Sequence, residues 1–212
     1  MNEVTRKKIT SGTNQEDLTS GNACWETAPA VFAKLNRDFG PFQFDICGDA
    51  QRHRCDVWFG PQSPVQEYNA LTSMWYKYGT NGFCNPPYGR FISQILPHAV
   101  HMAEMGCTSL FLIPLRITVP FKRSIMPHAS KVYFCDRRLI FWENGAPRLN
   151  PKTGKPDPAV FDSVLVQFKP NYSQGRPVFD IWEAPSANAM GCFASGEPDC
   201  DITVGTGLGL FG

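Results

Sequence analysis

The segment from residue 81 to 115 constrains the fold more than any other part of the chain. It holds a short apolar strand end (residues 83 and 84), a loop that its prolines keep irregular, a helical stretch (90 to 105) and a second apolar run (108 to 115). The second run is apolar nearly throughout, as in strands buried on both faces of a parallel sheet. The order strand, loop, helix, buried strand therefore predicts an α/β domain with a mostly parallel sheet flanked by helices.

Other elements are predicted around this unit. A first helix is expected over residues 28 to 39, with Thr27 as its N-cap, Pro29 in its first turn and Gly40 at its end. Pro97 should kink or split the helix over residues 90 to 105. Asn81-Gly82 is a turn signal. Further strands are predicted at residues 42 to 47, 131 to 135, 139 to 142 and 164 to 168, and residues 144 to 158 are expected to form a surface loop.

The chain has room for one domain with flanking segments. At 212 residues we expect a polar, flexible lead-in (1 to 22), one folded domain (23 to 184) and a glycine-rich C-terminal tail (185 to 212). The longest apolar runs are far shorter than the ~20 residues that span a bilayer, and no apolar stretch follows the basic residues near the N-terminus. These features predict a soluble protein of the cytoplasm that does not contact membranes.

Eight cysteines raise the question of disulfides or a metal. No two of them form a Cys-x-x-Cys pair, and most lie in apolar runs, so we expect reduced, packed thiols. His53 and Cys55, near Cys47, resemble half of a zinc site without its second half. The prediction is that the protein binds no metal.

Charge is distributed unevenly although the net charge is only +1. Residues 116 to 155 carry nine basic and two acidic side chains, whereas residues 24 to 70 carry four basic and six acidic ones. A basic half is typical of a protein that binds a polyanion. Candidate DNA-binding residues are Arg116, Lys122, Arg123, Arg137 and Arg138. The alternative is that these side chains only keep the surface soluble.

The loop Asn85-Pro86-Pro87-Tyr88 holds the candidate catalytic residues. An exocyclic amine on a base is a poor nucleophile because its lone pair is delocalised into the ring. Two acceptors on its two hydrogens would direct that lone pair at a methyl donor. The Asn85 side-chain oxygen and the Pro86 backbone carbonyl, fixed by the prolines, could be those acceptors. Tyr88 offers a face for stacking an extruded base, a contact worth ~1–3 kcal/mol.

The sequence resembles the amino-methyltransferases, whose signature is Asp/Asn/Ser-Pro-Pro-Tyr/Phe at a strand end, and more narrowly the phage and prophage DNA N-6-adenine-methyltransferase family. The likeness covers roughly residues 24 to 170. Its members, in chain order, are Trp25-Glu26-Thr27-Ala28-Pro29, Phe44-Asp45-Ile46-Cys47, Asn69-Ala70-Leu71, Trp75, the Asn-Pro-Pro-Tyr loop, Leu112-Ile113-Pro114, Arg138-Leu139-Ile140-Phe141 and Ser163-Val164-Leu165-Val166.

This resemblance implies a Rossmann-like fold that binds S-adenosylmethionine at the carboxyl ends of the strands, with DNA as substrate. The residues it implies for the methyl donor are Trp25, Thr27, Pro29, Asp45, Asn69 and Asn85. For two of them the alternative is a purely structural role: Asp45 could cap a following helix, and Trp25 could pack against the first helix. Asn69 departs from the family, which tends to have an acidic residue there, and no Phe-x-Gly-x-Gly loop is present.

The function predicted from the sequence is therefore transfer of a methyl group from S-adenosylmethionine to adenine N6 of DNA. Within the same chemistry, the alternatives are cytosine N4, an RNA base or a protein glutamine. A catalytically silent DNA-binding relative is an alternative of another class. A small metal-dependent nuclease, a third alternative, would need clustered carboxylates with a nearby lysine. Asp45 and Asp49 with His53 match that requirement only in part.

Overall fold

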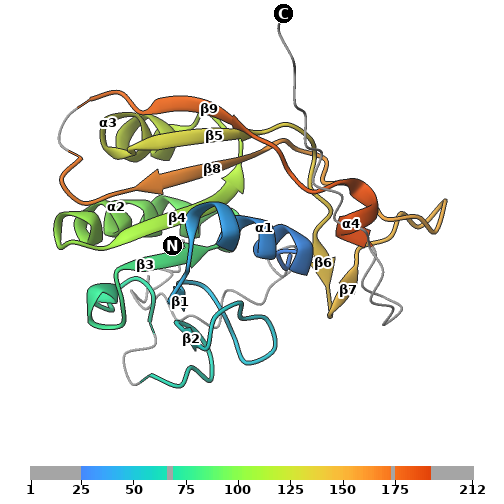
Figure 1. The fold of residues 1–212 in the computed structure, drawn as a ribbon, viewed down its shortest axis with the longest axis horizontal. Helices are drawn as coiled ribbons and strands as arrows, with labels where there is room; N and C mark the ends of the chain where they lie inside the picture. The colour runs from blue at the N-terminus through green and yellow to red at the C-terminus, as the bar shows by residue number, and fades with distance from the viewer. Residues whose placement is uncertain (1–24, 66–68, 173–174, 192–212) are drawn as a thin grey trace, which may run out of the picture.

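A seven-stranded sheet forms the centre of the molecule (Figure 1). The structure is a computed structural model, and it describes residues 25–65, 69–172 and 175–191. The strand order is β2-β1-β3-β4-β8-β5-β9, and only β8 runs antiparallel to its neighbours, β4 and β5. The strands are β1 Phe44–Asp45, β2 Val57–Trp58, β3 Asn81–Cys84, β4 Thr108–Pro114, β5 Lys131–Cys135, β8 Ser163–Phe168 and β9 Val178–Trp182. The predicted α/β fold with a mostly parallel sheet, consistent with a Rossmann-like methyltransferase, is confirmed.

Helices cover both faces of this sheet (Figure 1). α2 (Arg90–Glu104), η3 (Phe121–Ile125) and α3 (Met126–His128) lie on one face, whereas α1 (Pro29–Phe39) and α4 (Ala187–Gly191) lie on the other. Side chains of β4 alternate between the two layers: Phe111 and Ile113 belong to the core under α2, and Leu110 and Leu112 belong to the core under α1. This two-sided burial explains why the strand is apolar throughout.

Helix α1 matches its prediction except at its first residue. Pro29 occupies the first turn and Gly40 ends the helix. The N-cap is Ala28, which makes no side-chain cap, and Thr27 Oγ1 is buried without a hydrogen-bond partner. The prediction of Thr27 as N-cap is wrong because this side chain makes no hydrogen bond to the first helical N–H groups.

Helix α2 is continuous through Pro97 and is not split. Pro97 is exposed, so it lies on the solvent side of the helix. Because proline has no N–H, the backbone carbonyl one turn before Pro97 receives no helical hydrogen bond from it. That carbonyl lies on the solvent side of the helix, where water can donate to it.

Three local predictions need correction. Asn81 and Gly82 begin strand β3 and form no turn. Residues 139 to 141 are buried but lie outside any strand, and only Trp142 enters the hairpin of β6 (Trp142–Glu143) and β7 (Ala146–Pro147). That hairpin also interrupts the predicted loop over residues 144 to 158. Neither β2, β9, α4 nor the short helix η2 (Trp75–Lys77) was predicted.

The packed region continues past residue 184. Helix α4 buries Met190, whose backbone oxygen accepts a hydrogen bond from Trp142 Nε1 at 2.9 Å. The predicted lead-in and the predicted tail from residue 192 onward lie outside the described residues. Among the described residues, no helix is long and apolar enough to cross a membrane.

Candidate active site

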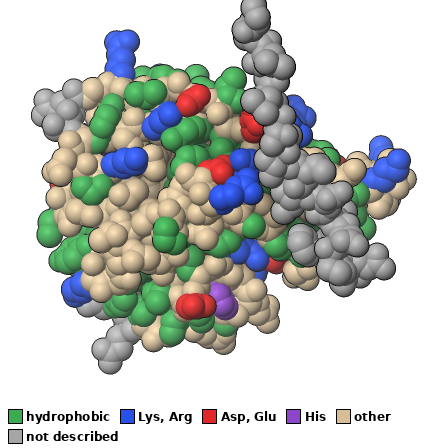
Figure 2. Space-filling view, in the orientation of Figure 1, with side chains coloured by type: hydrophobic (Ala, Val, Ile, Leu, Met, Phe, Trp, Pro, Cys, Tyr) green, Lys and Arg blue, Asp and Glu red, His purple; other side chains and the backbone are tan. Residues whose placement is uncertain are grey.

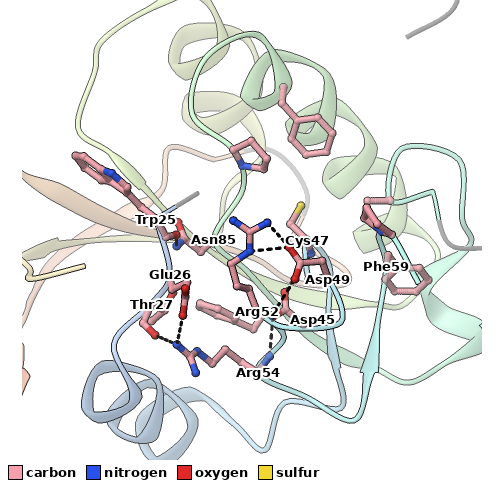
Figure 3. A pocket seen from close by; sticks show the side chains of 16 residues that line it. Trp25, Glu26, Thr27, Asp45, Cys47, Asp49, Arg52, Arg54, Phe59 and Asn85 are labelled. Carbon is pink, nitrogen blue, oxygen red and sulfur yellow. Dashed lines mark hydrogen bonds and ion pairs between the residues drawn. The ribbon is translucent and has the colours of Figure 1, made fainter. Parts of the chain in front are cut away.

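A hollow that is open to solvent lies where β1 and β3 end (Figure 3). Most of its lining comes from the end of β1 and the residues after it, the end of β3 and the loop after it, and the segment before α1; residues after β2, Ala70 and the first turn of α2 complete it. The carboxyl ends of parallel strands are where such sheets bind ligands. The lining residues are Trp25, Glu26, Thr27, Asp45, Cys47, Gly48, Asp49, Arg52, Arg54, Phe59, Pro61, Ala70, Phe83, Asn85, Pro87 and Phe91.

Asp45 lies at the base of this pocket and is only 3 % exposed. Its carboxylate accepts hydrogen bonds from the backbone N–H of Cys47 at 3.1 Å and of Arg54 at 3.0 Å (Figure 3). Burial raises the pKa of Asp45 to about 6, although these hydrogen bonds and the Arg54 charge oppose the shift. Residues 46 to 54, which follow β1, form no helix, so Asp45 closes this loop instead of capping a helix.

Arg54 and Glu26 form a second polar contact in the pocket wall (Figure 3). The Arg54 guanidinium donates to the backbone oxygen of Thr27 and lies 3.8 Å from the Glu26 carboxylate. Glu26 is also buried and accepts from the backbone N–H of Gly145 at 3.1 Å. The pair therefore holds the segment before α1 against the loop after β1 and the β6–β7 hairpin.

A further charge pair borders the pocket. Arg52 Nη2 lies 2.5 Å from Asp49 Oδ2, and Asp49 also accepts the backbone N–H groups of Gln51 and Arg52 at 2.9 Å. The pocket thus presents carboxylates and guanidinium groups side by side. The sequence prediction included none of Glu26, Asp49, Arg52 and Arg54 among the donor-binding residues, and their only signal was their nearness in sequence to Trp25 and Asp45.

The loop after β3, which holds the candidate catalytic residues, is fixed by its own asparagine. Asn85 Nδ2 donates to the backbone oxygen of Trp25 at 2.8 Å, which leaves Oδ1 as the acceptor of this amide. Pro86 is buried and Pro87 lines the pocket. The loop ends at Gly89, whose φ of 122° suits glycine, and α2 begins there.

Four aromatic rings pack beside this loop. Trp25 stacks on both Phe141 and Phe161, with ring centroids 5.4 and 5.3 Å away, and those two rings are 6.2 Å from each other. Tyr88 meets Phe161 edge-on at 5.5 Å. The Tyr88 hydroxyl is buried without a hydrogen-bond partner, and burial raises its pKa far above the usual range. Arg148 lies over the Trp25 ring at 4.9 Å. Trp25 therefore packs on the hairpin side of the loop as well as lining the pocket.

Two of the donor-binding candidates do not line the pocket. Pro29 lies in the first turn of α1. Asn69 forms a turn in which its side-chain oxygen accepts the N–H of Leu71 at 3.0 Å, while its neighbour Ala70 lines the pocket. Trp25, Thr27, Asp45 and Asn85 all do line it.

The DNA-binding candidates divide into paired and unpaired side chains. All five are exposed. Arg137 is 2.6 Å from Asp136, and Arg138 is 3.4 Å from Asp162. Ion pairs of Arg116, Lys122 and Arg123 are absent from the described part of the chain. On the face shown in Figure 2, the Lys and Arg side chains that can be seen are scattered among apolar and uncharged ones.

Among the described residues, no three His, Cys, Asp or Glu side chains are grouped to hold a metal ion. His53 Nδ1 contacts the backbone oxygen of Asp49 and its ring stacks on Trp58 at 4.0 Å. The five described cysteines are free, and Cys47 and Cys84 bring their sulfur atoms to 3.2 Å.

Comparison with known proteins identifies the family. A search of curated proteins gave no significant match. The family model for DNA N-6-adenine-methyltransferase (Dam) matches residues 14–188, which include every element that builds the pocket. Members of such a family generally use S-adenosylmethionine and act on DNA. The chain therefore belongs to the DNA N-6-adenine-methyltransferase (Dam) family, and its activity is methylation of adenine N6 in DNA.

Proposed function

We propose that the pocket at the ends of β1 and β3 binds S-adenosylmethionine and that the loop after β3 holds the target adenine of DNA. The chain would then act as a site-specific adenine methyltransferase. The observation that carries this assignment is the hydrogen bond from Asn85 to Trp25, because it orients the one side chain suited to accept from the adenine amine at the border of the pocket.

The pocket's chemistry fits this methyl donor. S-adenosylmethionine carries an α-ammonium and an α-carboxylate, and the pocket presents both charge signs through Asp45, Asp49 and Arg52. Its wall also contains Thr27, whose buried Oγ1 makes no hydrogen bond and is an orphan that a polar ligand group would satisfy. An adenine ring would find the apolar part of the wall, formed by Phe59, Pro61, Ala70, Phe83 and Phe91.

The target amine would be held by two acceptors. Asn85 Oδ1 would accept one hydrogen of N6, and the Pro86 carbonyl would accept the other. Accepting both hydrogens draws the nitrogen toward tetrahedral geometry and frees its lone pair to point into the pocket. Placing two reactants in such an orientation can contribute ~7–11 kcal/mol to the lowering of the barrier.

When bound, S-adenosylmethionine supplies an activated methyl group on a sulfonium. No protein nucleophile is required for direct transfer. Cys84, which precedes Asn85, is fully buried, and burial raises its pKa well above the ordinary value, so it stays a thiol. The task of the chain is thus to bind, to orient and to exclude water.

Analysis of the modified nucleosides tests this function. The purified protein would be incubated with unmethylated DNA and S-adenosylmethionine, and the DNA digested to nucleosides for mass spectrometry. The expected product is N6-methyladenine, lost in Asn85→Ala but kept in Val178→Ser, an exposed change far from the pocket segments in sequence. Absence of any methylated nucleoside, with no binding of S-adenosylmethionine, would contradict the proposal.

A further inference from the structure

The segment between β4 and η3 displays two large apolar side chains to solvent. Ile117 is 72 % exposed and Val119 is 59 % exposed. Single exposed apolar side chains are ordinary on protein surfaces. Two of them lie here in one short segment, and this segment follows β4, the strand that pairs with β3 before the Asn85 loop. Their position relative to that loop suggests a role in DNA binding.

The backbone that carries these side chains is held at both ends. At one end the Leu115 N–H donates to the Asp162 oxygen at 2.8 Å, and at the other the buried Phe121 begins η3. Between them, Thr118 bonds to the backbone oxygen of Arg116 at 2.9 Å and accepts from the Lys122 N–H at 3.1 Å. Ile117 and Val119 are therefore presented on a defined turn.

A short series of contacts links this turn to the catalytic loop. Tyr88 meets the Phe161 ring at 5.5 Å, Asp162 is the next residue, and its oxygen holds Leu115. Strand β4 also pairs with β3, so that Phe111 lies beside Cys84, the residue before Asn85. The six residue-to-residue steps from Phe111 to Ile117 span at most about 20 Å, a distance that some six base pairs of duplex cover at ~3.4 Å each.

Positive charge flanks the apolar pair. Arg116 precedes Ile117, and Lys122 and Arg123 follow Val119 by a few residues; all three are exposed. In the part of the chain that the structure describes, none of the three forms an ion pair. An apolar centre with basic flanks is complementary to the interior and the phosphates of a duplex.

We propose that Ile117 and Val119 form a wedge that enters the base stack of duplex DNA when the target adenine leaves it, while Arg116, Lys122 and Arg123 contact the flanking phosphates. This rests on the proposed function, because a base inside a duplex must be extruded to reach the loop at Asn85. Apolar side chains inserted between base steps unstack them and kink the duplex. Both wedge residues are β-branched, so insertion restricts few side-chain rotamers.

DNA unwinding tests the wedge directly and needs no knowledge of the recognition sequence. A plasmid would be relaxed by a type I topoisomerase in the presence of the protein, and the linking number measured after the protein is removed. The wedge variant is Ile117→Ser with Val119→Ser. The matched control is Val178→Ser with Ile181→Ser, because these β9 residues are 57 % and 68 % exposed.

We expect the wild-type protein and the control variant to lower the linking number. The wedge variant should do so by less than a quarter as much at the same number of bound molecules. Equal unwinding by the wedge variant, or equal loss in the control, would overturn the proposal, as would wild-type protein that binds the plasmid without unwinding it.

Methylation rates give a second test that separates the two proposals. The ratio of the rate on native DNA to that on heat-denatured DNA should fall about tenfold in the wedge variant, because a single strand needs no extrusion. If wild-type protein formed no N6-methyladenine on either substrate, the proposed function would fail, while the linking number would still decide the wedge.

Discussion

The side-chain amide of Asn85 donates to the backbone oxygen of Trp25 at 2.8 Å, and this bond ties the loop after β3 to the segment before α1. The two residues lie sixty positions apart in the sequence. Trp25 in turn stacks on Phe141 and Phe161. The orientation of the Asn85 amide is therefore set by an aromatic cluster that reaches as far as the segment before β8.

Replacing Asn85 should remove turnover and spare the methyl donor. In Asn85→Ala the acceptor for the amine is gone, and we expect kcat to fall by ~100-fold or more, the scale seen when one polar contact to a reacting group is lost. The affinity for S-adenosylmethionine, measured by calorimetry, should change by less than about threefold. Asn85→Asp is the informative companion, because it keeps the acceptor and loses the donor to Trp25. Activity of Asn85→Ala equal to wild type would refute the role of this residue.

The hydroxyl of Tyr88 should be dispensable. It is buried and has no hydrogen-bond partner, so Tyr88→Phe removes an unsatisfied polar group. The free energy of unfolding, measured in urea, should stay unchanged or rise by about 1 kcal/mol. Tyr88→Ala should lower it by about 3 kcal/mol, since the ring packs against three other aromatic rings.

Methylation rates complete this comparison. We expect Tyr88→Phe to retain the wild-type rate and Tyr88→Ala to weaken DNA binding, because only the ring can stack on an extruded base. A tenfold loss of rate in Tyr88→Phe would instead assign the hydroxyl a contact with DNA.

Asp45 should make stability fall as pH rises. Its pKa is about 6 in the folded protein and about 3.9 in an unfolded chain, so the folded state binds the proton more tightly. The stabilisation that this proton provides is fully present below pH ~4 and is lost as pH rises through about 6. Over that window the contribution of this single group amounts to roughly 3 kcal/mol.

Urea denaturation at several pH values checks the sign. The difference in unfolding free energy between wild type and Asp45→Asn should move in favour of the variant from pH 4 to pH 7, since the amide of the variant carries no charge to bury. Groups that the two proteins share cancel in this comparison. A constant difference across the window would show that the carboxyl of Asp45 titrates normally in the folded state.

Part of the pocket follows from the sequence because some of its residues end strands of one parallel sheet. A prediction that places Asp45 and Asn85 after two such strands also places them at one edge, and both line the pocket. Thr27 and Trp25 join them through the family resemblance, although Thr27 does not cap α1. Sheet topology and the family resemblance together predicted these residues.

Contacts between side chains that are distant in the sequence could not be predicted from such patterns. Nothing in the local sequence pairs Glu26 with Arg54 or directs Glu26 to the N–H of Gly145. Strand β9 has four exposed residues of its five, so it lacks the apolar alternation that marks a buried strand. Asn69 is the reverse case. It was predicted to bind the methyl donor, and its side chain instead accepts a hydrogen bond within a turn.

The basic residues should differ in their contribution to DNA binding according to their partners. Arg116, Lys122 and Arg123 are exposed and without an ion pair in the described structure, whereas Arg137 and Arg138 lie beside Asp136 and Asp162. A phosphate contact releases counterions, and each one lost reduces the slope of log K against log salt by ~1. Lys122→Ala with Arg123→Ala should therefore reduce the slope by about 2. Arg137→Ala with Arg138→Ala should reduce it by less, because their neighbouring carboxylates already offset part of the charge.

Fluorescence anisotropy would measure the affinity of wild type and the two double variants for one duplex between about 50 and 200 mM salt, a range over which such affinities fall strongly. Equal slopes for all three proteins would show that the phosphates bind elsewhere.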